Sequence, residues 1–500
     1  MVKKEKIFRM PVVQFPTGYE VSLSNSYYSN LVYRNIHDTL LKEDRREYEN
    51  LLVENWFTPE ENQITVKIRD DIRFSDGSLM TVEDVRDTFL WMLGIPTSVL
   101  YNVSIIDSII INDAQTLDFY STNSPQVLVR LLSMVGILKS EAISKGVEYL
   151  NEHPVSTGVY HIHSKDHQVI VLKKNKYHKM YAKNKTAPDI VELILEPDLE
   201  KLYELLLAKK IDFIQHLPLN FYNDVFSEQK YQIIEKESDT LILLMLNAAS
   251  ERLSTIRIRQ NDKAHVSTDT LNPLQDIRVR QAIAHVIDID HFIETEVNSK
   301  AYSLVLPMLR HVPGYPINIP WYEYDLEHSR SLMREAGFSE GFEMDIHIIE
   351  GKFSTPLAYY IRDCLNKINI DVNVIVQDFS TFLIVDTGNA ASIRAFISRG
   401  SDTFRSMVMG RFFYNPRMQN TGNFYQNYSP RINEALSQFV PTEDYDAKFY
   451  AQCEELSRII MDEAFIISLL NPFDIYLLTK KFVYQPSSNQ INFTDFKIKK

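Results

Sequence analysis

Apolar and polar residues alternate along several short segments, and this alternation predicts β-strands. Residues 64–68 (ITVKI) have the pattern of a half-buried strand, and residues 105–111 and 116–120 are expected to form a strand pair. Residues 241–246 are almost entirely apolar, which is typical of a strand buried on both faces. Residues 247–274 are polar and lack sustained periodicity, so we interpret most of them as a long surface loop.

Helical spacing of apolar residues alternates with these strands. Thr81 and Asp84 have the spacing of a capping box and predict a helix that runs to about Leu93. Further helices are expected at residues 128–138, 199–209, 278–287, 326–336 and 357–368. Further strands are expected at residues 169–173, 189–195, 344–348 and 372–376. This alternation predicts an α/β protein.

The composition is that of a globular protein without a catalytic glycine-rich loop. The length of 500 residues suggests two to four domains, and the shares of hydrophobic residues (45%) and charged residues (24%) are ordinary for a globular protein. The formal net charge of −13 makes the chain a poor candidate for binding nucleic acid, which requires a basic surface. Only 14 glycines are present, and the two cysteines, Cys364 and Cys453, exclude a disulfide scaffold and a four-thiolate zinc site.

No apolar run reaches the roughly 18 residues that would span a bilayer. The basic start at residues 1–6 is not followed by an apolar segment, so we expect no signal peptide in the chain as given. Two explanations remain open: an exported protein whose leader has been removed, or a cytoplasmic protein.

Catalytic and metal-binding motifs are weak. The chain has no HExxH, GxSxG or P-loop motif, so we do not expect an enzyme. His161, His163 and His167 could ligate a metal ion, but we favour a solvated hairpin. Arg405 precedes a stretch rich in methionine and aromatic residues (407–414), which could line a ligand site or form a buried segment.

Six segments, taken in chain order, carry a resemblance to a known family. They are residues 68–85 (IRDDIRFSDGSLMTVEDV), 153–160 (HPVSTGVY), 207–212 (LAKKID), 276–290, 325–337 and 423–436. These segments resemble signatures of the family-5 extracellular solute-binding proteins, whose best-known members bind oligopeptides for ABC importers. The resemblance extends over about residues 28–480.

The resemblance implies a two-lobed α/β fold of the periplasmic-binding-protein type (type II, the large peptide-binding class), with an extra domain inserted in the first lobe. The first lobe would comprise residues 1–40, 155–245 and 471–500. The inserted α/β domain would comprise residues 41–154, and the second lobe residues 246–470.

The resemblance also implies a binding function without chemistry or cofactor. A small solute, with an oligopeptide as the leading candidate, would enter a cleft between the lobes, which then close by hinge motion. The expected partners are this ligand and the ABC permease subunits of the cytoplasmic membrane. The expected location is extracytoplasmic, and the expected state is a monomer that does not bind nucleic acid.

The candidate site residues follow from the same resemblance. A buried ligand ammonium group requires a carboxylate, and Asp402 matches the acid that fills this role in peptide-binding members. Asp38 matches a second acid at the cleft. The structural alternatives are a turn-capping role for Asp402 and a helix-surface carboxylate for Asp38. Lower-ranked candidates are Asn423, Tyr425, Arg405 and Tyr101.

Two other functions remain open. The chain is also similar to the solute-binding domain of a class of helix-turn-helix transcription regulators, although it contains no helix-turn-helix itself. A third hypothesis is a receptor for a metal chelate, as for nickel or opine-like ligands in this family. The three histidines of the predicted hairpin support this hypothesis only weakly.

Overall fold

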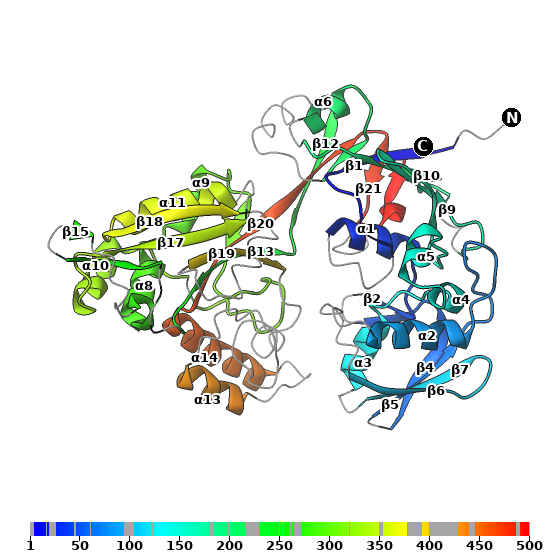
Figure 1. Ribbon diagram of the computed structural model, residues 1–500, viewed down its shortest axis with the longest axis horizontal. Helices are drawn as coiled ribbons and strands as arrows, with labels where there is room; N and C mark the ends of the chain where they lie inside the picture. The colour runs from blue at the N-terminus through cyan, green and yellow to red at the C-terminus, as the bar shows by residue number, and fades with distance from the viewer. Residues whose placement is uncertain are drawn as a thin grey trace. The chain divides into compact units, whose positions relative to one another are not determined.

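The computed structural model describes most of the chain (Figure 1). The described residues are 5–16, 18–19, 27–44, 47–60, 62–94, 105–121, 125–179, 185–198, 201–215, 230–249, 251, 253, 255–260, 263–264, 272–319, 321–349, 354–377, 393–399, 429–439, 446–486 and 491–499.

The chain divides into two compact units. The first unit comprises Met1–Glu235 and Ile475–Lys500, and the second comprises Lys236–Asp474. The chain therefore leaves the first unit once and returns to it once. Each unit contains both sheets and helices, in line with the predicted α/β class. The predicted separation of residues 41–154 as an inserted domain stays a prediction.

One sheet of the first unit joins distant parts of the chain. Its strand order is β1-β10-β9-β8, with β1 parallel to β10 and the other neighbours antiparallel. The bounds are β1 Ile7–Val12, β8 Tyr160–Lys165, β9 Val169–Lys174 and β10 Ile190–Leu195. The returning C-terminal segment packs against this sheet, because the ring of Phe8 in β1 lies 4.2 Å from that of Phe496, measured between ring centroids.

A second sheet of the first unit is entirely antiparallel. Its order is β4-β5-β7-β6, with bounds β4 Val53–Glu60, β5 Gln63–Ile68, β6 Ile106–Ile111 and β7 Thr116–Ser121. Helix α2 (Val82–Leu93) packs on it, and Phe89 meets Phe119 edge-on at a centroid distance of 5.1 Å. The capping box of Thr81 and Asp84 is present, which confirms the predicted start of this helix.

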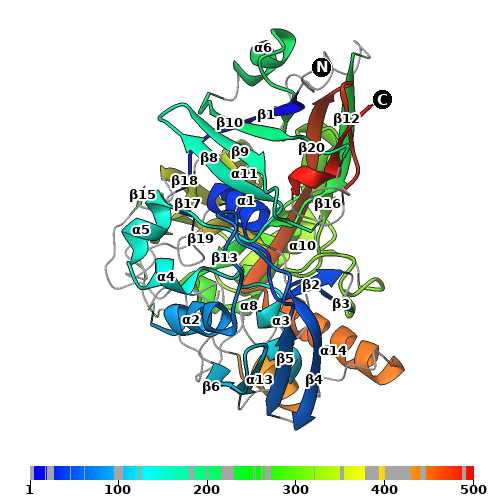
Figure 2. The same cartoon turned by 90° about the vertical axis from the view of Figure 1, so that its right-hand side faces the viewer.

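The first unit also contains short helices and hairpins. Helix α1 lies against β8 (Figure 2). The helices are α1 Tyr27–Ile36, α3 Pro125–Leu132, α4 Ser140–Ile143, α5 Val147–Glu152, α6 Lys201–Leu207 and the 3₁₀ helix η6 Phe493–Asp495. The remaining strands are β2 Leu41–Asp44, β3 Glu47–Asn50, β11 Phe213–Ile214, β21 Phe482–Tyr484 and β22 Phe496–Ile498, and β12 Tyr231–Glu237 begins in this unit and ends in the second.

The second unit is built around a mixed sheet. Strand β17 pairs in parallel with β18 and β19, whereas β13 lies antiparallel between β19 and β20. The residues of β13 from Leu241 to Leu246 are all buried, as their continuous apolar pattern predicts. The bounds are β13 Thr240–Leu246, β14 Arg257–Gln260, β15 Lys263–Ala264, β16 Ala301–Ser303, β17 Phe342–Ile349, β18 Ile370–Gln377, β19 Ile393–Arg399 and β20 Ile466–Thr479, whose last residues, from Ile475, belong to the first unit.

Aspartate side chains cap several helices of the second unit. Asp276, Asp288 and Asp325 each accept a hydrogen bond from a backbone N–H in the first turn of α8, α9 and α10. The helices are the 3₁₀ helix η4 Pro273–Gln275, α8 Ile277–Val286, α9 Ile289–Thr295, α10 Leu326–Glu335, α11 Ser354–Asn366, α13 Pro430–Gln438 and α14 Ala447–Glu463. Nowhere in the described part of the chain is a helix both long and apolar enough to cross a membrane.

The structure adds detail to two sequence-based expectations. Within residues 247–274, which we expected to be mostly loop, Arg257–Gln260 forms the short strand β14, which pairs with β17 and β15. Four residues are too few to produce a recognisable alternation. The helix expected to continue to residue 138 ends at Leu132. The chain turns there because Gly136 donates its N–H to the hydroxyl of Tyr33 at 2.6 Å.

Arg280 of α8 is the most extensively bonded buried cation of those described in the second unit. Its guanidinium donates to the carbonyl oxygens of Glu463, Leu274 and Gln275 at 2.6, 2.9 and 2.9 Å. It also lies 3.4 Å from the carboxylate of Glu463 and over the ring of Phe465. Burial lowers the pKa of Arg280 to about 10, which still leaves it charged at neutral pH. Arg280 therefore ties α8 to the end of α14.

We expect Arg280→Met to lower the free energy of unfolding by about 3–5 kcal/mol, because it leaves Glu463 and three carbonyls without their buried partner. The matched control is Arg278→Met on the same helix, whose ion pair with Asp276 is partly exposed to solvent and contributes about 0–1 kcal/mol. Denaturant titration followed by circular dichroism measures both values. Equal effects of the two substitutions would contradict the structural role of Arg280.

Candidate functional site

One of the six predicted ligand-binding residues lies in the described part of the chain. That residue is Asp38, which lies two residues beyond the end of α1 at Ile36. The other five lie outside the described residues and stay predictions: Asp402, Asn423, Tyr425, Arg405 and Tyr101.

Asp38 is a largely buried acid in a constrained position. Its side chain is 13% exposed, and its Oδ2 lies 2.8 Å from Nε2 of His178. Its backbone is bound on both sides, since its N–H donates to Oγ1 of Thr157 at 2.9 Å and its carbonyl accepts from the N–H of Ile137 at 3.0 Å. Asp38 is therefore not the freely solvated helix-surface carboxylate that the structural alternative assumed.

The glycine of the 157–158 turn allows this position. Gly158 donates its N–H to the carbonyl of Ile36 at 2.7 Å. A Cβ atom at Gly158 would lie 2.5 Å from the carbonyl carbon of Ile36 and 2.9 Å from the nitrogen of His37. Any larger residue would push the end of α1 away, so the glycine determines where the chain that carries Asp38 runs.

A second turn holds His178 against Asp38. Asn175, which is 1% exposed, donates from Nδ2 to the carbonyl of Gly158 at 3.1 Å and accepts from the N–H of Tyr177 at 3.0 Å. The carbonyl of Asn175 accepts the N–H of His178 at 3.1 Å. Our sequence interpretation did not include His178. The sequence feature that could have indicated this turn is Asn175, three residues earlier, because asparagine side chains commonly form hydrogen bonds with the backbone of their own turn.

His37 separates Asp38 from the core of the first unit. Its ring is 4% exposed, donates from Nε2 to the carbonyl of Tyr19 at 3.1 Å and packs against Tyr33. Burial lowers the pKa of His37 to about 4, and the hydrogen bond to Tyr19 offsets this only in part. His37 is therefore neutral at physiological pH and does not compensate the charge of Asp38.

The Asp38–His178 pair can act in two ways. It links the end of α1 to the turn after β9, which stabilises the first unit. In addition, the carboxylate of Asp38 is oriented by His178 and is partly accessible to solvent, and a carboxylate in this arrangement can bind a cationic ligand group.

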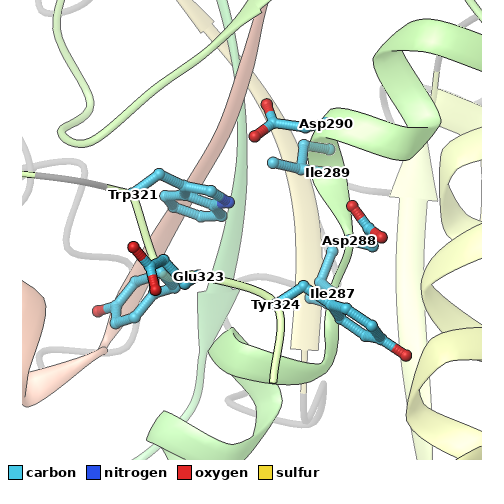
Figure 3. Close-up of a pocket in the computed structure, with 8 residues that line it drawn as sticks. Ile287, Asp288, Ile289, Asp290, Trp321, Glu323 and Tyr324 are labelled. Atoms are coloured by element: carbon cyan, nitrogen blue, oxygen red, sulfur yellow. The ribbon is translucent and has the colours of Figure 1, made fainter. Parts of the chain in front are cut away.

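The second unit contains a separate small pocket with a volume of about 280 Å³ (Figure 3). Trp321 and Asp290 lie on opposite sides of it, and Asp288 and Tyr324 continue the lining. The remaining lining residues are Ile287, Ile289, Tyr322 and Glu323. Asp288 already caps α9 by accepting the N–H of His291 at 3.1 Å, so this acid has a structural role.

Histidines, cysteines and acids of the described chain do not assemble in groups of three or more that could hold a metal ion. Two of the histidines singled out in the sequence, His161 and His163, lie in β8 with ring centroids 6.5 Å apart. The third, His167, is exposed after the end of that strand.

Comparison with known families decides the classification. The model of the bacterial extracellular solute-binding proteins, family 5, middle region, matches residues 47–419. The chain belongs to this family. The resemblance inferred from the six sequence segments is thereby confirmed.

Individual relatives differ in the ligand for which they are named. The chain is 22% identical over 347 residues to the nickel-binding protein NikA of Staphylococcus aureus, an alignment of 68% of this chain and 64% of that protein. It is 32% identical over 119 residues to the dipeptide-binding protein of Escherichia coli, over 22% of each chain. The alignments thus span less than two thirds of these curated relatives.

The fold is shared over nearly the whole chain. The periplasmic binding protein DppA of Helicobacter pylori, solved in complex with the peptide STSA, has a TM-score of 0.79 and 20% identity, and 99% of each chain is covered. The oligopeptide-binding protein AppA of Bacillus subtilis, solved with a nonapeptide, has a TM-score of 0.77 and 16% identity, over 99% of this chain and 100% of that one. The predicted type II periplasmic-binding-protein fold is confirmed.

We expect acid to destabilise the first unit through His37. Its pKa is about 4 in the folded protein against 6.5 ordinarily, so the unfolded chain binds more protons between these values. The free energy of unfolding should therefore fall as the pH drops from about 6.5 to about 4, by roughly 3 kcal/mol at most.

His37→Asn should flatten this part of the stability curve, measured by denaturant unfolding at each pH. His167→Asn, which replaces an exposed histidine of the same unit, should leave the curve unchanged. A wild-type slope in His37→Asn would show that another group is responsible.

Proposed function

We propose that this protein is an extracytoplasmic receptor that captures a small solute, with an oligopeptide as the leading ligand, and delivers it to an ABC importer. The single observation that carries the proposal is the family match over residues 47–419, which includes parts of both compact units. The proposed partners are the ligand and two permease subunits in the cytoplasmic membrane. The protein would act as a monomer and without catalysis.

The chemistry of the candidate acids supports a ligand that carries an ammonium group. A peptide in water has a charged amino terminus, and burying it without a counter-charge is costly. The carboxylate of Asp38 is fixed in position and partly accessible to solvent, and a ligand cation can replace His178 as its partner. Asp402 remains the predicted primary acid. Hydrogen bonds from the ligand backbone would add affinity with little dependence on side chains.

Native mass spectrometry of freshly purified protein, compared with its denatured mass, tests the proposal directly. We expect a ladder of bound masses separated by amino-acid residue masses, because a receptor with little side-chain selectivity retains a mixture of peptides. One discrete organic mass would contradict a peptide mixture and would favour a receptor or sensor for a single compound.

A second candidate function is a receptor for a metal chelate. The specific observation that favours it is the similarity to the nickel-binding protein of Staphylococcus aureus over 68% of this chain. In the same mass-spectrometry experiment, a bound metal together with a small chelator would support this function and replace the peptide proposal.

The contribution of Asp38 can be separated from the overall function. We expect wild-type protein to bind trialanine at least about 10-fold more tightly than N-acetyl-trialanine, because only the former offers an ammonium group to a carboxylate. Asp38→Asn should reduce that preference, as measured by isothermal titration calorimetry of both peptides.

Asp363→Asn is the matched control, since Asp363 is 62% exposed and pairs with its neighbour Arg362 on a helix of the second unit. It should bind both peptides as the wild type does. An unchanged preference in Asp38→Asn would assign Asp38 to the structural link with His178 alone.

A further inference from the structure

Two histidines of the second unit lie side by side on adjacent helices, next to Tyr322 and Glu323 of the small pocket. His285 is in the last turn of α8, and His328 is in the first turn of α10. Their ring centroids are 5.0 Å apart and their planes meet at 80°. His328 is exposed and His285 is partly exposed, so solvent reaches both.

The hydrogen bonding of His285 determines which ring nitrogen can act as a ligand. Its Nδ1 lies 2.9 Å from the carbonyl oxygen of Glu323. A carbonyl only accepts, so Nδ1 carries the proton, and the neutral ring has its lone pair on Nε2. A histidine whose other nitrogen donates to a backbone carbonyl is the usual form of a metal ligand, because this bond orients the ring and raises its basicity.

The separation of the two rings is compatible with one shared metal ion. An ion about 2.1 Å from a ring nitrogen lies about 3.2 Å from the centre of that ring. When the angle between the two nitrogen–metal bonds is roughly 90–110°, the two ring centres are therefore about 4.5–5.2 Å apart. The observed 5.0 Å lies within this range. The ring centroids of His161 and His163, 6.5 Å apart, lie outside it.

The backbone around the pair is held in place. The N–H of Asp325 donates to the carbonyl of His285 at 2.9 Å, and the side chain of Asp325 accepts the N–H of His328 at 2.8 Å. The ring of Tyr322 packs edge-on against His285 at 5.4 Å between centroids. The two helices also contact each other along their length. A preorganised pair of ligands loses less conformational freedom on binding a metal ion than two independent side chains would.

We propose that His285 and His328 form a two-histidine site for a first-row transition-metal ion such as Cu²⁺, Ni²⁺ or Zn²⁺, with water in the remaining positions. Imidazole nitrogen suits these ions, whereas Mg²⁺ and Ca²⁺ prefer oxygen ligands. The carboxylates of Glu323 and Asp325 are close in sequence and add negative charge to this part of the surface. The site lies within the second unit and does not depend on the proposed peptide function.

The test uses the tag-free full chain and CuCl₂ in a buffer without imidazole or chelator. Calorimetry should show a Cu²⁺ site that either His285→Gln or His328→Gln weakens at least about 10-fold, the lower end of the effect of losing even an outer-shell partner. Electron paramagnetic resonance should show nitrogen hyperfine structure that both variants change. Binding should also weaken on acidification, because protons compete for the ligand nitrogens.

His163→Gln and His311→Gln replace exposed histidines elsewhere and should leave this site unchanged. Circular dichroism of each variant checks the fold, and the exposed position of His328 makes His328→Gln the safer of the two. Wild-type Cu²⁺ affinity in both His285→Gln and His328→Gln would overturn the proposal. Loss of the same site in Asp38→Asn would also overturn it, because that result would place the ion in the first unit.

Discussion

The close approach of Gly158 to Ile36 is the contact on which the arrangement of the candidate acid depends. The N–H of Gly158 reaches the last carbonyl of α1 at 2.7 Å, and the space for a Cβ atom is occupied by the backbone of Ile36 and His37. Helix α1, the turn before β8 and the turn after β9 therefore meet at one point. At this junction the backbone N–H of Asp38 is hydrogen-bonded, and its carboxylate points to His178. An unsatisfied backbone group at such a depth would be costly, so the junction tolerates few alternatives.

In the second unit, a charged side chain rather than a glycine brings helix ends together. Arg280 supplies donors to three carbonyl oxygens where η4, α8 and the end of α14 converge. The guanidinium is buried and its pKa is lowered, yet it stays charged because Glu463 faces it. Both junctions use residues far apart in the sequence to satisfy backbone groups at the ends of helices. Helix ends leave such groups unpaired by necessity, so they are where long-range contacts are most specific.

The comparisons separate what the fold decides from what the side chains decide. Structures with TM-scores near 0.8 and identities of 20% or less share this chain's fold, and the relatives carry names that refer to nickel and dipeptides. One architecture therefore accompanies several ligand chemistries, and ligand choice must lie in particular side chains.

Local signals in the sequence were sufficient to predict much of the secondary structure and to indicate the family. The capping box of Thr81 and Asp84 and the apolar run of β13 depend on neighbours within a few residues, so the sequence alone determined them. The short strand Arg257–Gln260 and the pairing of Asp38 with His178 escaped prediction. His178 lies 140 residues from Asp38, and no local pattern encodes which distant turn will meet a helix end. Only tertiary packing decided that contact, because hydrogen bonds between remote segments form once the sheets have brought those segments together.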